Sequence, residues 1–142
     1  MTDKFSRRML NALIDANRYT EVLYPLQTGV PAVGVPLAAG NTVWGDYADI
    51  IGAGTITVEF WLLQAQFDTN DSATQFDVQV YSATRTTTLY QMRVNCTAVT
   101  CNLGPVTFRI PVYCIPSDQI QGRSAGTNTK VIGLSLYTAV GL

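Results

Sequence analysis

The sequence predicts an all-β protein, a jelly-roll-like β-sandwich preceded by a short N-terminal helix and an extended arm. From residue 55 onward, apolar residues recur at every second position in runs as long as strands. Clusters of Asn, Asp, Gly, Ser and Pro separate these runs. A chain of 142 residues can bury one core. We therefore expect a helix and arm over residues 1–41 and one sandwich domain over residues 42–142.

The only helix that the sequence predicts covers residues 3–17, where apolar residues follow a helical spacing. An amphipathic helix ahead of a β-domain must bury its apolar stripe. The stripe packs either on its own sandwich or on a neighbouring subunit, and the sequence leaves both alternatives open. In the second alternative the contact residues of the helix are Phe5, Arg7, Arg8, Met9 and Leu13.

Residues 25–40 are apolar but are interrupted by three prolines and three glycines. Neither a helix nor a central strand tolerates this pattern. We therefore expect an extended arm that lies against a surface, which belongs either to its own domain or to a partner. In the latter case the contact residues of the arm are Val30, Val33, Val35 and Leu37.

The sandwich domain should contain six to eight strands. They are expected at residues 42–47, 55–62, 76–80, 88–94, 106–114, 119–121 and 130–137, with turns at 68–72, 102–105 and 122–128. Pro111 interrupts an otherwise regular strand, which predicts a sheet edge or a bulge there. Cys114 lies in an alternating strand and should be a small core residue. Cys96 and Cys101 are either free thiols or are joined by a disulfide across a short turn.

The composition offers little equipment for catalysis. The chain has no histidine, so the usual group for proton transfer near neutral pH and for activating a nucleophile is missing. Close carboxylate pairs occur at Asp46 and Asp49 and at Asp68 and Asp71, in expected turns, where aspartate commonly caps the backbone. We expect no enzyme activity and no catalytic residues.

No cofactor and no metal site is expected either. Asp68, Asn70 and Asp71 offer oxygens of the kind that calcium takes, but a plain hairpin turn has the same composition. A net charge of −1 gives no cationic field for nucleic acid, so we expect no nucleic-acid partner. No apolar run approaches the roughly 18 residues of a membrane span, so we expect no membrane association.

Arginines and aromatic residues are the remaining candidates for binding. Planar guanidinium groups make ordered hydrogen bonds between chains, so Arg85 and Arg123 are expected at protein interfaces, although ordinary surface charge explains either one alone. The aromatic residues that are either a platform for a sugar or anchors of a core or interface are Trp44, Trp61, Tyr81 and Tyr90.

A resemblance to a known family rests on the architecture of the whole chain. The segments that carry it are residues 5–10, 25–40 and 130–137. The chain is also rich in Thr, and only 13% of its residues are charged. In this architecture it resembles the small jelly-roll decoration, or cement, proteins of tailed bacteriophages. The resemblance implies a virion structural protein, made in the host cytoplasm and located on the outer capsid surface. Such a protein self-associates as a dimer or trimer, binds the major capsid protein, bridges its subunits and stabilises the shell.

A second class of function stays open, namely a receptor-binding or carbohydrate-binding sandwich from a phage tail or appendage. Exposed aromatic residues around a concave site would indicate this recognition module. Flat apolar contact surfaces would indicate a cement protein.

Overall fold

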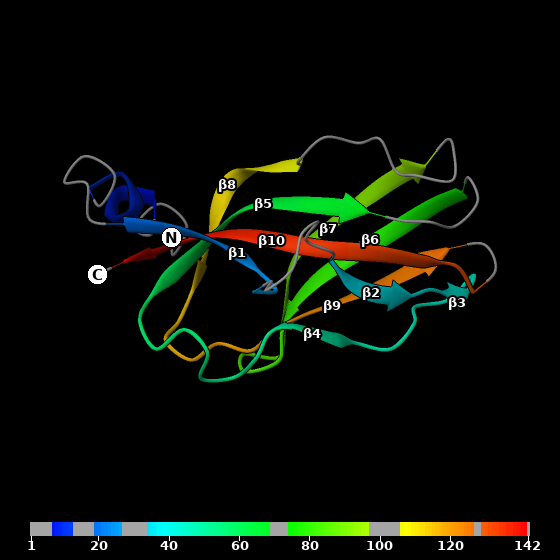
Figure 1. The fold of residues 1–142 in the computed structure, drawn as a ribbon, viewed down its shortest axis with the longest axis horizontal. Helices are drawn as coiled ribbons and strands as arrows, with labels where there is room; N and C mark the ends of the chain where they lie inside the picture. Colours follow the sequence, from blue (N-terminus) through cyan, green and yellow to red (C-terminus); the bar gives the residue numbers. More distant parts are fainter. Residues whose placement is uncertain are drawn as a thin grey trace.

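A computed structural model describes residues 7–12, 19–26, 34–68, 74–96, 106–126 and 129–141. Within these ranges ten strands form two five-stranded sheets that pack face to face (Figure 1). A short helix at residues 7–12 precedes them. The predicted all-β sandwich with a short N-terminal helix is confirmed.

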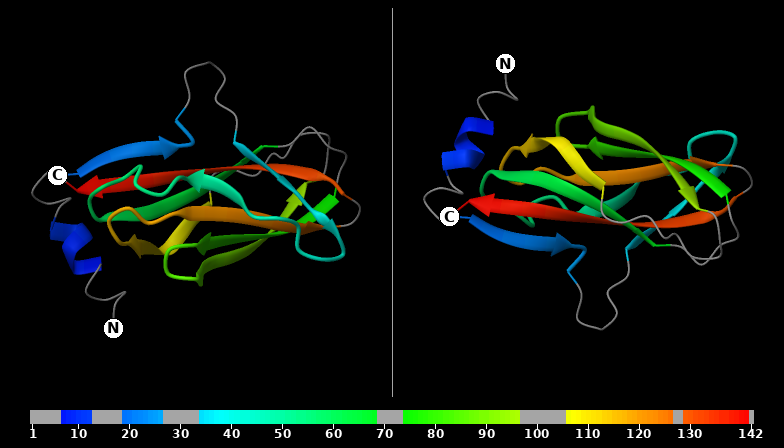
Figure 2. Two further views of the ribbon diagram at one scale, coloured as in Figure 1. Left: turned by 90° about the horizontal axis from the view of Figure 1, so that it is seen from below. Right: turned by 90° about the horizontal axis from the view of Figure 1, so that it is seen from above.

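The first sheet, sheet A, has the strand order β1-β10-β5-β8, and all of its pairs are antiparallel. Its strands are β1 (Tyr19–Tyr24), β2 (Val35–Ala38), β5 (Phe60–Asp68), β8 (Val106–Cys114) and β10 (Val131–Gly141). Strands β1 and β2 follow one another along β10, since Tyr24 lies opposite Leu136 and Val35 lies opposite Leu134. Together they make one edge of sheet A (Figure 2).

The second sheet, sheet B, has the order β3-β9-β6-β7, and β4 also pairs with β9. Its strands are β3 (Gly40–Asn41), β4 (Ala48–Ile51), β6 (Thr74–Ser82), β7 (Thr87–Cys96) and β9 (Ile120–Gly126). When β1 with β2 and β3 with β4 each count as one edge position, the two sheets have the orders 1-8-3-6 and 2-7-4-5. This is the strand order of a jelly roll.

The core lies between the two sheets and follows from the period-two pattern. On β6, Phe76, Val78 and Val80 are fully buried, while Asp77 between them faces outward. Cys114 of β8 is also fully buried, which confirms its predicted place in the core. Each fully buried Phe or Val side chain stabilises the fold by about 1.5–3 kcal/mol, because its apolar surface is removed from water.

The N-terminal helix packs on its own sandwich. Leu10 is buried against Trp61 of β5 and Ala139 of β10, on the face of sheet A that points away from sheet B, and Met9 packs beside it. The helix lies beside the end of β10 (Figure 2). Residues 3–6 and 13–17 of the predicted helix lie outside the described residues. No described helix has the length and apolar character to cross a bilayer.

Strands β1, β2 and β3 lie in the segment that was expected to be an arm, and three further strand assignments differ from the expectation. Residues 42–47 form no strand, and β4 begins at Ala48, because Thr42 adopts a φ of 60° that interrupts the extended backbone. Residues 55–59 precede β5 instead of forming its first half. Strand β9 continues through most of the turn expected at 122–128. Gly122 belongs to this strand because a Cβ there would come within 3.0 Å of the Leu134 side chain of the facing sheet.

Candidate functional site

The outer face of sheet B is polar, and its side chains are joined in pairs across the strands. Alternate residues of β6, β7 and β9 point away from the core, so the strand pairing places polar side chains of neighbouring strands beside one another. The hydrogen-bonded pairs are Gln75 with Asn95 (2.8 Å), Asp77 with Arg93 (2.7 Å and 3.1 Å) and Gln79 with Gln91 (3.1 Å).

Asp77 and Arg93 form an exposed ion pair on this face. The hydrogen bonds from the Arg93 guanidinium lower the pKa of the Asp77 carboxyl, and the same hydrogen bonds raise the pKa of Arg93. The Arg93 side chain is 62% exposed, so water and salt screen the pair. Its main effect is to occupy the hydrogen-bonding groups of both side chains.

Arg123 of β9 lies at the centre of an arginine–aromatic cluster made of Trp44, Tyr47, Gln79, Tyr81 and Arg123. Its guanidinium carbon is 5.0 Å from the centre of the Trp44 ring and 4.4 Å from that of Tyr47. Its Nε donates a hydrogen bond of 2.7 Å to Oε1 of Gln79. The Tyr47 ring stacks on Tyr81 with centroids 4.6 Å apart. These contacts hold the guanidinium in one orientation.

The loop between β3 and β4 brings Trp44 and Tyr47 to this position. Gly45 N donates a hydrogen bond of 2.8 Å to the carbonyl of Ser124, and Thr42 N donates one of 2.9 Å to the carbonyl of Gly126. Because both acceptors belong to β9, the loop is fixed to the strand that carries Arg123. The cluster is therefore built on a sheet and on a loop that is hydrogen-bonded to it.

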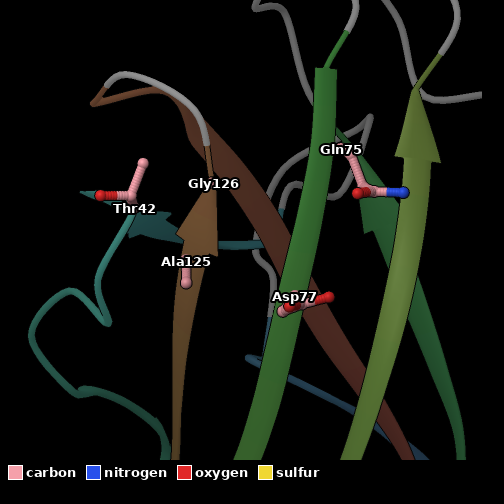
Figure 3. Close-up of a pocket in the computed structure, with 5 residues that line it drawn as sticks. All are labelled: Thr42, Gln75, Asp77, Ala125 and Gly126. Atoms are coloured by element: carbon pink, nitrogen blue, oxygen red, sulfur yellow. The ribbon is translucent and has the colours of Figure 1, made fainter.

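A shallow hollow of about 200 Å³ adjoins the cluster on the same face of sheet B. Its lining residues are Thr42, Gln75, Asp77, Ala125 and Gly126 (Figure 3). Ala125 follows Arg123 by two positions on β9, and Asp77 precedes Gln79 by two positions on β6, so both face the same side. The hollow and the cluster form one continuous surface.

A second candidate surface lies between the edge strands β7 and β8 and is here called the β7–β8 seam. Its lining residues are Leu89, Tyr90, Arg109, Ile110, Pro111 and Val112, around a hollow of about 230 Å³. Tyr90 contacts Phe108 across the seam with ring centroids 4.6 Å apart. Ile110 is 41% exposed, so it adds apolar surface to the seam.

Strand β8 is irregular where it borders the seam. Leu62 of β5 lies opposite Val112, but Gln64 lies opposite Thr107, so residues 108–111 bulge out of register. Strand β8 is also the last strand of sheet A in the described order. The prediction that Pro111 marks a sheet edge or a bulge is confirmed, since both are present.

Arg85 belongs to an internal polar network. Its Nη2 lies 2.7 Å from Oδ2 of Asp118, whose side chain is completely buried, and donates a hydrogen bond of 3.1 Å to the Tyr113 carbonyl. The Ser82 hydroxyl donates to Oδ1 of Asp118. The network ties the β6–β7 turn to the segment between β8 and β9. The interface role of Arg85 stays a prediction, and the structure shows that its guanidinium is turned inward to a buried charge.

The structure separates the predicted contact residues of the helix and the arm. Arg7 and Arg8 are exposed, whereas Met9 packs against its own sandwich. Leu37 is 1% exposed and lies in the core, so its predicted interface role is corrected. Val35 also packs against this core. The predicted contact residues that lie outside the described residues are Phe5, Leu13, Val30 and Val33.

The structure also separates the four aromatic residues that were candidates for a sugar platform. Trp61 is buried under the helix and Tyr90 packs against Phe108, whereas Trp44 and Tyr81 are partly exposed in the arginine–aromatic cluster. Sequence reasoning missed Tyr47 and Gln79. The alternation along β6 indicates that Gln79 faces outward, but only the three-dimensional arrangement shows that it meets Arg123.

The acidic residues serve the structure where they are described. Oδ1 of Asp49 accepts hydrogen bonds of 2.8 Å from both Gln119 and Gln121, and Asp68 lies close to the Gly34 amide. Within the described part of the chain, no three acidic or cysteine side chains gather as a metal site requires. The two candidate surfaces present hydrogen-bonding groups, aromatic rings and apolar side chains. No protein-family model matches this chain, and no curated protein matches it.

Proposed function

We propose that the chain is a non-catalytic virion structural protein, a decoration or cement protein on the outside of a bacteriophage head. There it binds the major capsid protein, bridges neighbouring subunits and stabilises the shell. The β7–β8 seam is the observation that carries this proposal. The jelly-roll strand order supports it, because this fold is common in virion shell proteins, although lectin domains share it.

The seam has the properties of a contact surface. Leu89, Ile110 and Val112 supply apolar area, and Arg109 lies at its border, as in interfaces with an apolar centre and a polar rim. Pro111 and the bulge disfavour backbone pairing through β8. Among the described strands, β7 pairs only with β6. A second copy of this chain seated on the seam would cover Ile110 and this free edge together, and the dimer or trimer would then bind the head at more than one point.

A protein that binds the outside of an assembled head would stabilise the shell by mass action. If it binds the assembled lattice and not the free subunit, the lattice gains about 2.7 kcal/mol per site at a free concentration of roughly a hundred times Kd. Repetition over the lattice adds avidity without any new contact. Modest apolar surfaces such as the seam are sufficient for this role.

Co-sedimentation with heads assembled without this chain tests the proposal. The full-length protein should pellet with such heads and raise their disruption temperature, and Ile110→Asp should weaken both effects. Val58→Asp is the matched control, because Val58 is also 41% exposed but lies outside the seam. A wild-type protein that stays in the supernatant at every concentration would contradict the proposal.

A second candidate function is favoured by the arginine–aromatic cluster. Partly exposed Trp44 and Tyr47 rings beside the shallow hollow of sheet B suit a receptor-binding or carbohydrate-binding module of a tail or appendage. Retention on an array of neutral and acidic glycans, without any binding to heads, would favour this second function over the first.

A further inference from the structure

We infer that the outer face of sheet B binds an acidic saccharide, with Arg123 holding its carboxylate and the exposed part of the Trp44 ring contacting an apolar face of the sugar. The inference deepens the second candidate function and rests on it. It does not depend on the decoration role, because the β7–β8 seam and this face involve different residues.

The orientation of Arg123 is fixed before any ligand arrives. Two aromatic rings and the hydrogen bond from its Nε to Gln79 hold the guanidinium plane. A side chain that is already ordered loses little conformational entropy on binding. The planar fork of a guanidinium matches a carboxylate with two parallel hydrogen bonds.

Arg123 differs from two other arginines of the sandwich in its partners. Arg93 is paired with Asp77 and Arg85 with Asp118. Within the described ranges Arg123 forms no ion pair, and Nε is the only nitrogen of its guanidinium group with a hydrogen-bond partner. A fixed cation with unused donors on an exposed face is complementary to an anionic group of a ligand.

The surroundings of Arg123 favour a hydroxyl-rich ligand. Gln91 and Gln121 are accessible amides that use only part of their hydrogen-bonding capacity in the cross-strand pairs. Asp77 and Thr42 border the adjoining hollow, which gives room for a neighbouring sugar unit along the same face (Figure 3). Sugar hydroxyls and ring faces match this mixture of amides and aromatic rings, whereas the apolar contact area that a protein partner needs lies at the seam.

The test is a calorimetric titration of the full-length protein with acidic oligosaccharides. The probes are hexagalacturonate, a hyaluronan hexasaccharide and sialyllactose, and the methyl ester of hexagalacturonate is the matched neutral form. We expect at least one acidic probe to bind, and Arg123→Gln to weaken that binding by about tenfold or more, as expected for loss of a charged hydrogen bond. Arg109→Gln removes one charge at the seam, away from this face, and should leave the affinity within about twofold.

The outcomes separate this inference from the functions on which it builds. Equal affinity for the acid and its methyl ester, or equal losses in Arg123→Gln and Arg109→Gln, would overturn the inference while leaving a carbohydrate-binding role. If no acidic or neutral probe binds, both the inference and the carbohydrate-binding function are overturned. The decoration role, which binding to heads tests, would still stand. If Arg123→Gln does not fold, as judged by circular dichroism, the comparison of acid and ester on the wild-type protein still decides the question.

Discussion

At the scale of single residues, Asp118 is the side chain whose loss should cost most. Its buried carboxylate accepts from the Ser82 hydroxyl and pairs with Arg85. Asp118→Ala would leave the Arg85 charge without its ion-pair partner and the Ser82 hydroxyl without its acceptor, so we expect the free energy of unfolding to fall by about 3 kcal/mol or more. Urea denaturation measures this loss. Asp77→Ala, which breaks the exposed pair with Arg93, is the control and should have a much smaller effect.

A loss for Asp118→Ala no larger than that for Asp77→Ala would contradict the structural role of this network.

The buried thiol of Cys114 should make stability depend on pH in the alkaline range. Burial raises the pKa of this thiol, so the folded state keeps a proton that the unfolded state loses above about pH 8.5. Stability is therefore complete below that pH and falls as pH rises, by at most about 1.4 kcal/mol per pH unit. In a background of Cys96→Ser and Cys101→Ser, Cys114→Ala should make the slope between pH 9 and 10 shallower.

Urea denaturation at three pH values measures these slopes. Tyr24 and Tyr113, whose pKa values burial also raises, titrate mainly above this range and are the same in both proteins. Equal slopes with and without Cys114 would show that its thiol ionises freely in the folded protein.

Alternation in the sequence predicts which side chains point inward but not which ones meet. Cys114 and the core residues of β6 follow directly from period two. Arg123 and Gln79 are 44 positions apart, and their contact depends on the pairing of β9 with β6. Arg85 and Leu37 were both assigned to interfaces, because nothing local shows that a buried Asp118 or the facing sheet lies next to them.

At the scale of elements, the N-terminal helix covers Trp61 of β5. Leu10→Ala should lower the free energy of unfolding by about 2–5 kcal/mol if the helix stays docked against the sheet in the native state. In a Trp44→Phe background, Trp61 is the only tryptophan. Its fluorescence should shift to the red in Leu10→Ala if the helix no longer shields the Trp61 ring from water. Asn11→Ala, at an exposed position of the same helix, should change neither quantity.

An unchanged emission maximum in Leu10→Ala, combined with unchanged stability, would mean that the helix does not protect Trp61 in solution.

Strand β1 should be essential to the sandwich although it belongs to the predicted arm. Its Tyr24 is buried in the main core, and all six of its residues pair with β10. Deleting residues 1–18 should preserve a cooperative thermal transition, whereas deleting residues 1–24 should remove an edge of sheet A and expose β10. Calorimetry of the two truncated proteins measures the difference, and equal melting temperatures would contradict this role for β1.

The elements with regular alternation, β6, β7, β8 and β10, were predicted close to their observed positions. Strand β2 was missed because Pro36 is tolerated at a sheet edge, which the sequence alone does not reveal. Strand β9 was taken for a turn because Gly122 and Gly126 are usually turn residues. Gly122 lies close to Leu134 of the facing sheet, and Gly126 lies close to Gln75 and Phe76 of the neighbouring strand, and neither tertiary contact is visible in the local sequence.

At the scale of the whole molecule, the jelly roll places the two candidate binding surfaces at different parts of one sandwich. The β7–β8 seam lies along one side, where both sheets end, and the arginine–aromatic cluster lies on the outer face of sheet B. A subunit could therefore be held in an assembly through the seam while the outer face stays accessible. This division of surfaces is what a protein on the exterior of a particle requires.

The central claim is that the β7–β8 seam is a subunit contact, and light scattering coupled to size-exclusion chromatography tests it most directly. The full-length protein should have the mass of a dimer or trimer, Ile110→Asp should have the mass of one chain, and Val58→Asp should keep the mass of the wild type. A wild-type protein of one-chain mass at every concentration, or an oligomer that Ile110→Asp leaves intact, would contradict the claim.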